Sequence, residues 1–235
     1  MPEASDRPTA AGRLLADVQA ELGPVDRAVR DHPFLAALSQ GRVPHDRLVD
    51  LAVEQQWIIA SDRRSFAFLA ARFPSAPAGD LFLQLAQGEG TALEHLAGFA
   101  RWLGQDPASL GEREPSARGQ AYTAFVAWLA MNGSATDVAL AFLANLAAWG
   151  ENCGRVSAAL GERHGAGPEA TAFFDFFATP APGFQEQALS VVQSGLAAGD
   201  PPAQARRAAR LLQSYELMFW DSLMDRWPPA TASTP

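Results

Sequence analysis

Tyr215-Glu216-Leu217-Met218-Phe219-Trp220-Asp221 is the stretch of this sequence that says most about its fold. It lies late in a segment that opens with Asp200, a residue type that caps helices, and with Pro201, which suits a first helical turn. These signals predict a helix from Pro201 to about Trp227. Glu216 is flanked in this stretch by aromatic and apolar side chains, and a second acid, Asp221, ends it. We expect Glu216 to face the interior of a bundle of helices.

The rest of the chain is also predicted to be helical, because Ala and Leu are abundant and β-branched residues are sparse. Pro44 suits the first position of a long helix, and Asp80 is a suitable cap for the next one. The Gly23-Pro24 pair should bend the first helix. The helices are expected over residues 10–30, 34–38, 44–72, 80–103, 116–131, 135–163, 168–177, 184–197 and 201–227, with a loop over 106–115. This pattern predicts an all-α fold.

No feature of the sequence divides the chain into two domains. Its 235 residues contain no repeat of fixed period and no linker rich in Gly and Ser. With 48% hydrophobic and 19% charged residues, the composition is that of a globular protein. We predict a single helical domain over residues 10–227, a flexible N-terminus over 1–9 and a disordered tail over 228–235.

The charge and the cysteine content exclude several classes of function. The formal net charge is −8, and an acidic surface disfavours nucleic acid as a partner. No apolar run approaches the roughly 18 residues that cross a bilayer. Residues 1–12 lack the order of a signal peptide, so we expect a cytoplasmic protein with no membrane partner. Cys153 is the only cysteine, which rules out an internal disulfide and a cysteine-based metal cluster.

Four segments, in order along the chain, share a pattern with a known family. They are His32-Pro33-Phe34-Leu35 with Gly41 and Leu48, Glu54-Gln55-Gln56-Trp57-Ile58-Ile59, Ala121-Tyr122-Thr123, and residues 215–221. Together they resemble the TenA/thiaminase-2 family, and they extend over nearly the whole chain. The resemblance implies a heme-oxygenase-like multi-helix bundle. It also implies a homo-oligomer, either a dimer or a tetramer.

Carried over residue by residue, the resemblance is partial. Glu216 matches the family's catalytic acid/base glutamate, and Tyr122 matches a pocket tyrosine. Counting from Tyr122 without gaps, the family's nucleophilic cysteine falls on Asn145, and a tyrosine one turn later falls on Trp149. The other matched pocket positions are an aspartate that binds the pyrimidine, on Gln55, and two tyrosines, on Ile58 and within Phe173–Phe177. The chain resembles a divergent member that lacks the family cysteine.

These replacements change the chemistry that the site can perform. A thiolate nucleophile cannot be replaced by Asn145, because an amide nitrogen is neither basic nor nucleophilic. Gln55 keeps hydrogen bonding but loses the charge of the aspartate it replaces. We therefore expect the family reaction in its usual form to be absent. The mixture of polar and aromatic side chains still indicates a small-molecule pocket.

The candidate site consists of one catalytic residue and several ligand-binding residues. Glu216 is the candidate acid/base, although it could instead be a surface or structurally paired acid. Glu54 and Gln55 are neighbours, so at most one of them faces the centre of the bundle. Cys153 lies only roughly on the face of Asn145 and is not a candidate nucleophile. The candidate ligand-binding residues are Tyr122, Asn145, Trp149, Gln55, Phe177 and Glu151.

Metal and heme sites are alternatives on the same fold. Glu89, Glu94 and His95 share one predicted helix, but no second helix supplies the histidine and carboxylate pair that a di-iron site needs. His32 as a heme ligand rests on the shared fold alone. We expect no cofactor and no metal.

The function that these residues favour is binding of a small heteroaromatic or amine-bearing molecule in a central pocket. If the protein is an enzyme, we expect it to hydrolyse or deaminate that molecule at a C–N bond, with water as the nucleophile and Glu216 as acid/base. Tyr122 and Asn145 would orient the ligand. The rival hypothesis is a non-catalytic binding protein that keeps the scaffold without the reaction.

Overall fold

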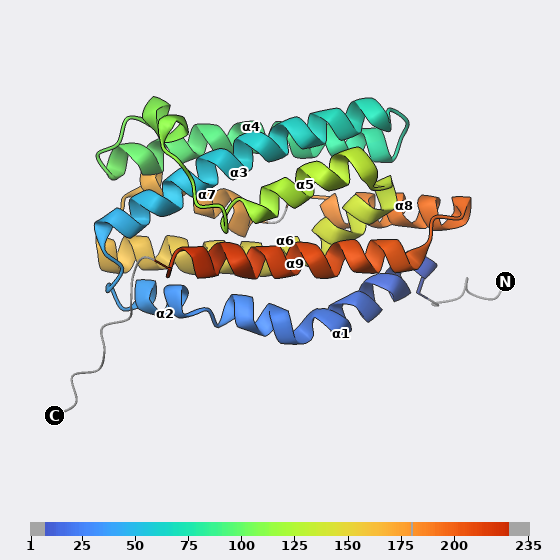
Figure 1. The fold of residues 1–235 in the computed structure, drawn as a ribbon, viewed down its shortest axis with the longest axis horizontal. Coiled ribbons are helices and arrows are strands. Elements are labelled where there is room, and N and C mark those ends of the chain that lie inside the picture. Colours follow the sequence, from blue (N-terminus) through green and yellow to red (C-terminus); the bar gives the residue numbers. More distant parts are fainter. Residues whose placement is uncertain (1–7, 180, 226–235) are drawn as a thin grey trace.

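The computed structural model describes residues 8–179 and 181–225, and every regular element within those ranges is helical (Figure 1). The elements are α1 (Ala10–Arg30), α2 (Pro33–Ser39), α3 (His45–Arg72), α4 (Ala78–Trp102), the 3-10 helix η1 (Pro107–Glu112), α5 (Ala121–Asn132), α6 (Ala135–His164), α7 (Pro168–Ala178), α8 (Phe184–Ala198) and α9 (Pro202–Ser222). The all-α prediction is confirmed. Most of the predicted flexible N-terminus, and all of the predicted tail, lie outside the described residues.

Local hydrogen bonds explain where several helices begin. Ser134 and Asp137 form a reciprocal capping box at the start of α6, which satisfies backbone N–H groups that have no partner within the helix. Gly165 closes the same helix in a left-handed conformation, with φ of 72°. The hydroxyl of Thr9 accepts the N–H of Gly12 and begins α1, which then continues through Pro24.

Two acids that the sequence suggests as helix caps are placed differently. Pro201 occupies the cap position of α9, and the carboxylate of Asp200 instead accepts a hydrogen bond of 2.5 Å from the Thr136 hydroxyl on α6. Asp80 lies within the first turn of α4, where its charge complements the helix dipole. The predicted caps at Asp200 and Asp80 are therefore wrong, because Asp200 is bonded to another helix and α4 begins earlier, at Ala78.

The beginning of α5 also differs from the prediction. The helix starts at Ala121 rather than at Ser116, since residues 116–120 form a turn held by Glu54 of α3. The buried Glu54 carboxylate accepts the backbone N–H of Ser116 at 2.6 Å and the side-chain amide of Gln120 at 2.8 Å. Glu54 thus anchors a connection between helices.

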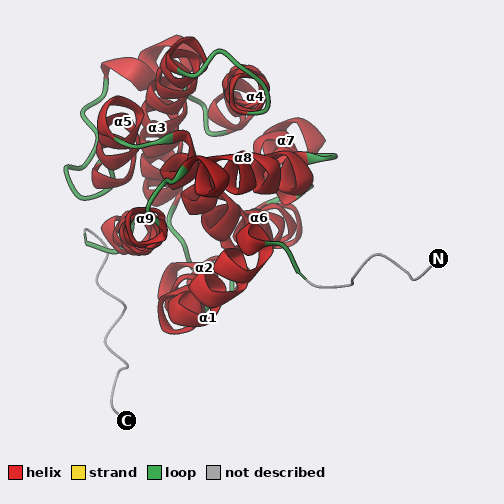
Figure 2. Cartoon of the chain, turned by 90° about the vertical axis from the view of Figure 1, so that its right-hand side faces the viewer, coloured by secondary structure: helices red, strands yellow, loops and turns green. Residues whose placement is uncertain are grey.

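The helices form two main walls joined by shorter helices (Figures 1 and 2). Helices α3 and α4 pack against each other as one wall, and α6 and α9 pack as the other. On one side α5 contacts both α3 and α9, and on the opposite side α7 contacts both α4 and α6 (Figure 2). Helices α1 and α2 cover the far side of the α6–α9 wall. The two walls and the shorter helices between them thus surround the interior of the bundle.

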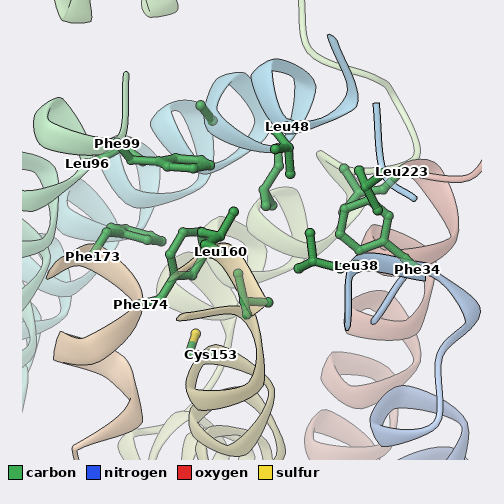
Figure 3. Packing of buried hydrophobic residues seen from close by; sticks show 14 of the residues in the cluster. Phe34, Leu38, Leu48, Leu96, Phe99, Cys153, Leu160, Phe173, Phe174 and Leu223 are labelled. Atoms are coloured by element: carbon green, nitrogen blue, oxygen red, sulfur yellow. The ribbon is translucent and has the colours of Figure 1, made fainter. Parts of the chain in front are cut away.

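The buried apolar side chains form two clusters. The first joins Phe34 of α2, Phe99 of α4, Cys153 of α6 and Phe173 of α7, part of which is drawn in Figure 3. The second joins residues of α1, α3, α4, α5, α6, α8 and α9, including Leu22, Phe66, Phe82, Val126, Leu140, Val192 and Leu212. Tyr122 packs against both clusters, so it lies where they meet.

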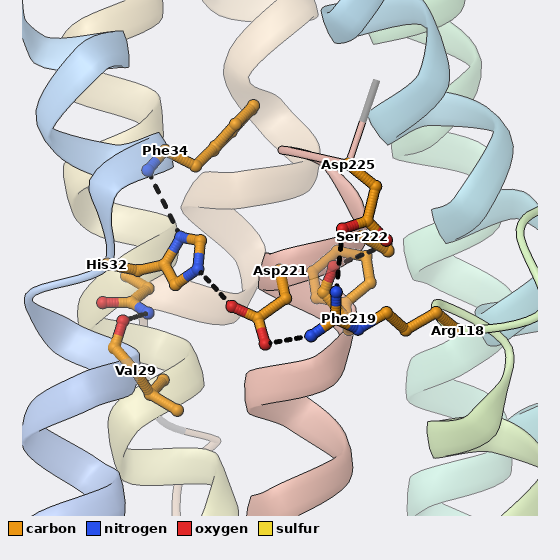
Figure 4. Close-up of polar contacts among 9 residues, drawn as sticks. Val29, His32, Phe34, Arg118, Phe219, Asp221, Ser222 and Asp225 are labelled. Carbon is orange, nitrogen blue, oxygen red and sulfur yellow. Dashed lines mark hydrogen bonds and ion pairs between the residues drawn. The ribbon is translucent and has the colours of Figure 1, made fainter. Parts of the chain in front are cut away.

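His32 and Asp221 tie the beginning of α2 to the end of α9 (Figure 4). Nδ1 of His32 accepts the N–H of Phe34 at 3.2 Å, and Nε2 lies 3.1 Å from Asp221 Oδ1. Arg118 bridges Asp221 at 2.6 Å and Asp225 at 2.8 Å. Both ring nitrogens of His32 are therefore engaged by the protein, which overturns its candidacy as a heme ligand.

Across the ranges that the structure describes, none of the helices combines the length and the apolar character needed to span a lipid bilayer.

Candidate functional site

A cavity lies between the two walls of helices, at the junction of the two apolar clusters. The empty space among its side chains, including the open space at its mouth, is about 450 Å³. Residues of α3, α4, α5, α6, α7 and α9 line it. They are Gln55, Ile58, Ile59, Asp62, Glu89, Tyr122, Phe142, Asn145, Leu146, Trp149, Phe177, Glu216 and Phe219.

Glu216 reaches the cavity from the α9 wall. Its side chain is buried, with 2% exposed, and burial raises the pKa of its carboxyl group to about 8. Hydrogen bonds from Trp220 and Asn145 oppose this rise because they favour the ionised form. Trp220 Nε1 donates to one carboxylate oxygen at 3.3 Å, and the side-chain amide of Asn145 donates to the other. A carboxyl group held in this way can exchange a proton near neutral pH.

Asn145 links Glu216 to Tyr122 through a chain of hydrogen bonds. The Tyr122 hydroxyl donates to Asn145 Oδ1 at 3.2 Å. Asn145 Nδ2 donates to Glu216 and also to Gln213 Oε1, at 3.0 Å. The orientation of the amide follows from these partners, since an oxygen could not donate to either acceptor. Asn145 therefore holds the carboxylate in place and offers no nucleophile.

Gln213 is a member of this network that the sequence prediction missed. It is fully buried on α9, three residues before Glu216 and therefore on nearly the same face of the helix. That spacing was the available signal, because a Gln one turn before a buried acid is well placed to share its hydrogen-bond partners.

Aromatic rings form another part of the cavity wall. Trp149 of α6 meets Phe177 of α7 edge to face at 5.8 Å and Phe219 of α9 at 6.1 Å between ring centroids. The cavity-lining positions proposed for Trp149 and Phe177 thus come together in the structure. These rings offer flat apolar surfaces against which a planar ligand can pack.

Gln55 lines the cavity from α3, while its neighbour Glu54 points to the turn before α5. Gln55 is buried, with 2% exposed, and its Oε1 atom has no hydrogen-bond partner. The cavity thus contains a buried acceptor without a donor, which is rare in folded proteins.

Two further carboxyl groups, those of Asp62 and Glu89, line the same cavity. Asp62 on α3 follows Gln55 by seven residues, two helical turns, and so shares its face. The Thr123 hydroxyl donates to Asp62 at 2.5 Å, while burial raises the Asp62 pKa to about 7. Burial, followed by repulsion from Asp62, raises the pKa of Glu89 well above its usual value. The two-turn spacing was the sequence signal for Asp62.

Glu89 lines the cavity, whereas Glu94 and His95, which the sequence suggested with it as metal ligands, do not. Glu94 is exposed, and the ring of His95 packs against Phe176 with centroids 5.7 Å apart. Within residues 8–179 and 181–225, no three His, Cys, Asp or Glu side chains gather around a position for a metal ion.

The structure does not bring Glu151 or Cys153 to the cavity. The Glu151 side chain is 54% exposed and pairs with Arg30 at 2.8 Å, so its predicted place in the site is corrected to the surface. Six residues along a helix turn the side chain about 120° away from Asn145. Cys153 is fully buried in the first apolar cluster, and burial raises the pKa of its thiol, which disfavours a reactive thiolate.

The arrangement of the helices and the central cavity define a heme-oxygenase-like bundle. The sequence profile of the TENA/THI-4/PQQC family matches residues 20–226, so the chain belongs to this family. No protein with a curated description matches the chain.

Solved structures share the fold at low sequence identity. A TenA homologue from Pyrococcus furiosus is 21% identical with a TM-score of 0.71, and the match covers 89% of this chain and 99% of that chain. A domain of unknown function with a heme oxygenase-like fold from Shewanella denitrificans is 12% identical with a TM-score of 0.71, covering 91% of both chains. A protein from Sulfolobus solfataricus, inferred to be a TenA-like thiaminase, is 14% identical with a TM-score of 0.65, covering 89% and 95%.

Proposed function

We propose that this protein binds a small heteroaromatic or amine-bearing molecule in the cavity and hydrolyses one of its C–N bonds. The observation that carries the proposal is the buried carboxyl group of Glu216, which lines the cavity and is bonded to Asn145. Membership of the TENA/THI-4/PQQC family supports a small-molecule site on this scaffold. The similar structure from Sulfolobus solfataricus, inferred to be a TenA-like thiaminase, supports cleavage of a C–N bond.

Water is the nucleophile in the proposed reaction, because Asn145 and its neighbours supply none. The ionised Glu216 carboxylate accepts a proton as water attacks the ring carbon that bears the amino group. The C–N bond then breaks, and the same carboxyl group gives the proton to the departing nitrogen. The ring carbon exchanges –NH₂ for –OH, ammonia leaves, and Glu216 returns to its starting form.

The raised pKa of Glu216 suits both halves of this cycle. A carboxyl group with a pKa of about 8 accepts a proton more readily than an ordinary glutamate and still releases it near neutral pH. An ordinary glutamate, with a pKa near 4.3, would be a much weaker base. Burial is the main cause of the shift, so the apolar surroundings of the cavity are part of the proposed chemistry.

The remaining residues hold Glu216 in place and form the surface against which the ligand packs. The Tyr122 hydroxyl and the Asn145 amide are engaged with each other, and they hold Glu216 at a fixed place on the wall. Trp149, Phe177 and Phe219 supply the surface against which a planar ring packs.

The test is release of ammonia from a series of single-ring aminopyrimidines by the purified full-length protein. We expect turnover that Glu216→Gln reduces by about 10²-fold or more, the usual contribution of a general acid/base, without a lower melting temperature. The matched control is Glu162→Gln, which removes an exposed acid from α6 and should leave turnover unchanged. Equal turnover in Glu216→Gln and the parent protein would contradict the assigned role.

A ligand that raises the melting temperature without being turned over would identify a non-catalytic binding protein instead. Asn145 is the observation that favours this second function, since a cavity without a nucleophilic side chain can bind without reacting.

A further inference from the structure

The α3–α4 side of the cavity carries two buried carboxyl groups that the proposed reaction does not use. Asp62 comes from α3 and Glu89 from the adjacent α4, and both line the cavity. Asp62 is 3% exposed and Glu89 is 9% exposed. None of the cavity-lining residues is Arg or His, so no positive side chain within the lining balances these acids.

The same side of the cavity also carries acceptors that have no donor. Gln55 Oε1 and Glu89 Oε2 are buried and make no hydrogen bond within the protein. Gln55 is 2% exposed and Glu89 is 9% exposed. Gln55 Oε1 only accepts hydrogen bonds, and Glu89 Oε2 does the same when the carboxyl group is ionised. Buried polar atoms are normally matched, and a ligand with N–H or O–H donors would match both of these.

The two sides of the cavity differ in this respect. On the α6–α9 wall, Asn145 donates to Glu216 and Trp220 supplies a further donor. On the α3–α4 side, the Thr123 hydroxyl donates a hydrogen bond to Asp62, whereas Glu89 Oε2 has no hydrogen-bond partner. Among the residues that line the cavity, the buried acceptors without a hydrogen bond therefore lie on the side made by Gln55, Asp62 and Glu89.

We propose that Gln55, Asp62 and Glu89 form a binding site for a positively charged nitrogen group of an organic ligand, such as an amidinium or a protonated amine. This inference rests on the proposed function, since it places the charged group of the ligand in the same cavity. A cation between Asp62 and Glu89 favours their ionised forms, which then supply the opposite charge, and Gln55 accepts a further N–H. A cation between the two acids also removes their mutual repulsion.

An organic cation fits the surroundings better than a hydrated metal ion. Ile58, Ile59 and Phe142 line the space beside the acids, and an apolar ligand body can pack against these side chains. A hard metal ion instead needs oxygen ligands on most of its sides. On the α3–α4 side of the cavity, the lining supplies oxygens from Gln55, Asp62 and Glu89 only.

Benzamidine tests the inference, because it has a single small ring and its amidinium group carries positive charge and several N–H donors. Benzamide is a neutral probe of nearly the same shape, and magnesium chloride tests the metal alone. Binding of each is measured by isothermal titration calorimetry with the full-length protein. The variants are Asp62→Asn and Glu89→Gln, with Glu94→Gln as a matched control that removes an exposed acid from the same helix.

We expect benzamidine to bind at least tenfold more tightly than benzamide. Asp62→Asn and Glu89→Gln should each weaken benzamidine binding about tenfold, while Glu94→Gln leaves it unchanged. The melting temperature of each variant without ligand shows that it is folded. Retention of the fold by either variant is sufficient for the comparison.

Several results would overturn the inference. They are equal binding of benzamide and benzamidine, no benzamidine binding at millimolar concentration, or tighter binding of magnesium than of benzamidine through the same two acids. Benzamidine binding that depends on Glu216 but not on Asp62 or Glu89 would place the cation on the other wall. That result would leave the proposed hydrolysis standing. Intact cation binding without turnover of any aminopyrimidine would instead refute the hydrolysis and keep the cation site.

Discussion

Asn145 on α6 donates a hydrogen bond to the carboxylate of Glu216 on α9, 71 residues further along the chain. The same amide is held by Tyr122 from α5, so three helices determine where the acid lies in the cavity. Position 145 is where the resemblance to the family places a nucleophilic cysteine. In this chain that position holds an acid in place instead, and the proposed reaction therefore relies on Glu216 and on water.

The first prediction concerns the pH dependence of turnover. In the proposed reaction the ionised form of Glu216 accepts the proton from water. We therefore expect kcat/KM to rise with pH through a midpoint near pH 8, the pKa of this carboxyl group, and to level off above it. A rate profile between pH 5 and 10 measures the midpoint. A profile that is already level at pH 5 would show that an acid with an ordinary pKa performs the step.

The second prediction concerns stability, which should fall as pH rises. Asp62 and Glu216 have folded-state pKa values of about 7 and 8, above the usual values of unfolded carboxyl groups. The folded protein therefore binds more protons between pH 5 and 8, and the free energy of unfolding decreases with pH. Each group contributes a slope of at most about 1.4 kcal/mol per pH unit.

Urea denaturation at pH 5, 6, 7 and 8 measures this slope in the parent protein and in Asp62→Asn. The variant should lose part of the slope, because its side chain no longer titrates. The titratable groups that interact with Asp62 are Glu89 and Tyr122, and both remain in the variant. An unchanged slope would show that Asp62 titrates normally in the folded state.

The third prediction compares the effect on stability of replacing two glycines of α4 by alanine. A methyl group at Gly98 of α4 would collide with the backbone carbonyl of Glu169 on α7, whereas at Gly88 its nearest neighbour would be Phe176 at 3.9 Å. Gly98→Ala should therefore destabilise the protein. Gly88→Ala should stabilise it by about 0.5–1 kcal/mol, because Ala favours the helix. Thermal unfolding of the two variants provides the comparison, and a stable Gly98→Ala would contradict the close contact of α4 and α7.

The fourth prediction distinguishes structure from function in the 215–221 stretch. Asp221 contacts His32 and Arg118 away from the cavity, so Asp221→Asn should lower the free energy of unfolding by about 1–3 kcal/mol. Benzamidine binding should stay unchanged when measured well below the melting temperature. Weaker binding in a fully folded Asp221→Asn protein would give this residue a role in the site.

Much of the fold was predictable from the sequence because local signals control it. Pro and Gly residues end most helices within a few residues of the predicted positions, and the family resemblance is confirmed. The start of α5 was not predictable, since it depends on Glu54, which lies more than sixty residues before Ala121 in the sequence and holds the preceding turn from another helix. The prediction follows local chemistry and misses contacts between distant segments.

The site shows the same division. Motif positions placed Tyr122, Asn145, Trp149, Gln55, Phe177 and Glu216, and the structure brings them to one cavity. Asp62 was missed although its two-turn spacing from Gln55 was available, and Glu89 was considered only as a metal ligand. That the two acids line one cavity depends on the packing of α3 against α4. Sequence spacing alone does not show which residues of two helices lie opposite each other.

The position of the cavity between the two apolar clusters links occupancy of the cavity to the resistance of the protein to proteolysis. Tyr122 joins regions that otherwise pack separately, and the space beside it interrupts the interior. An occupant that fills this space binds the folded chain and not the unfolded one, so it lowers the fraction of molecules open to proteases. Cellular abundance of this protein should then follow the supply of its ligand, even where synthesis is constant.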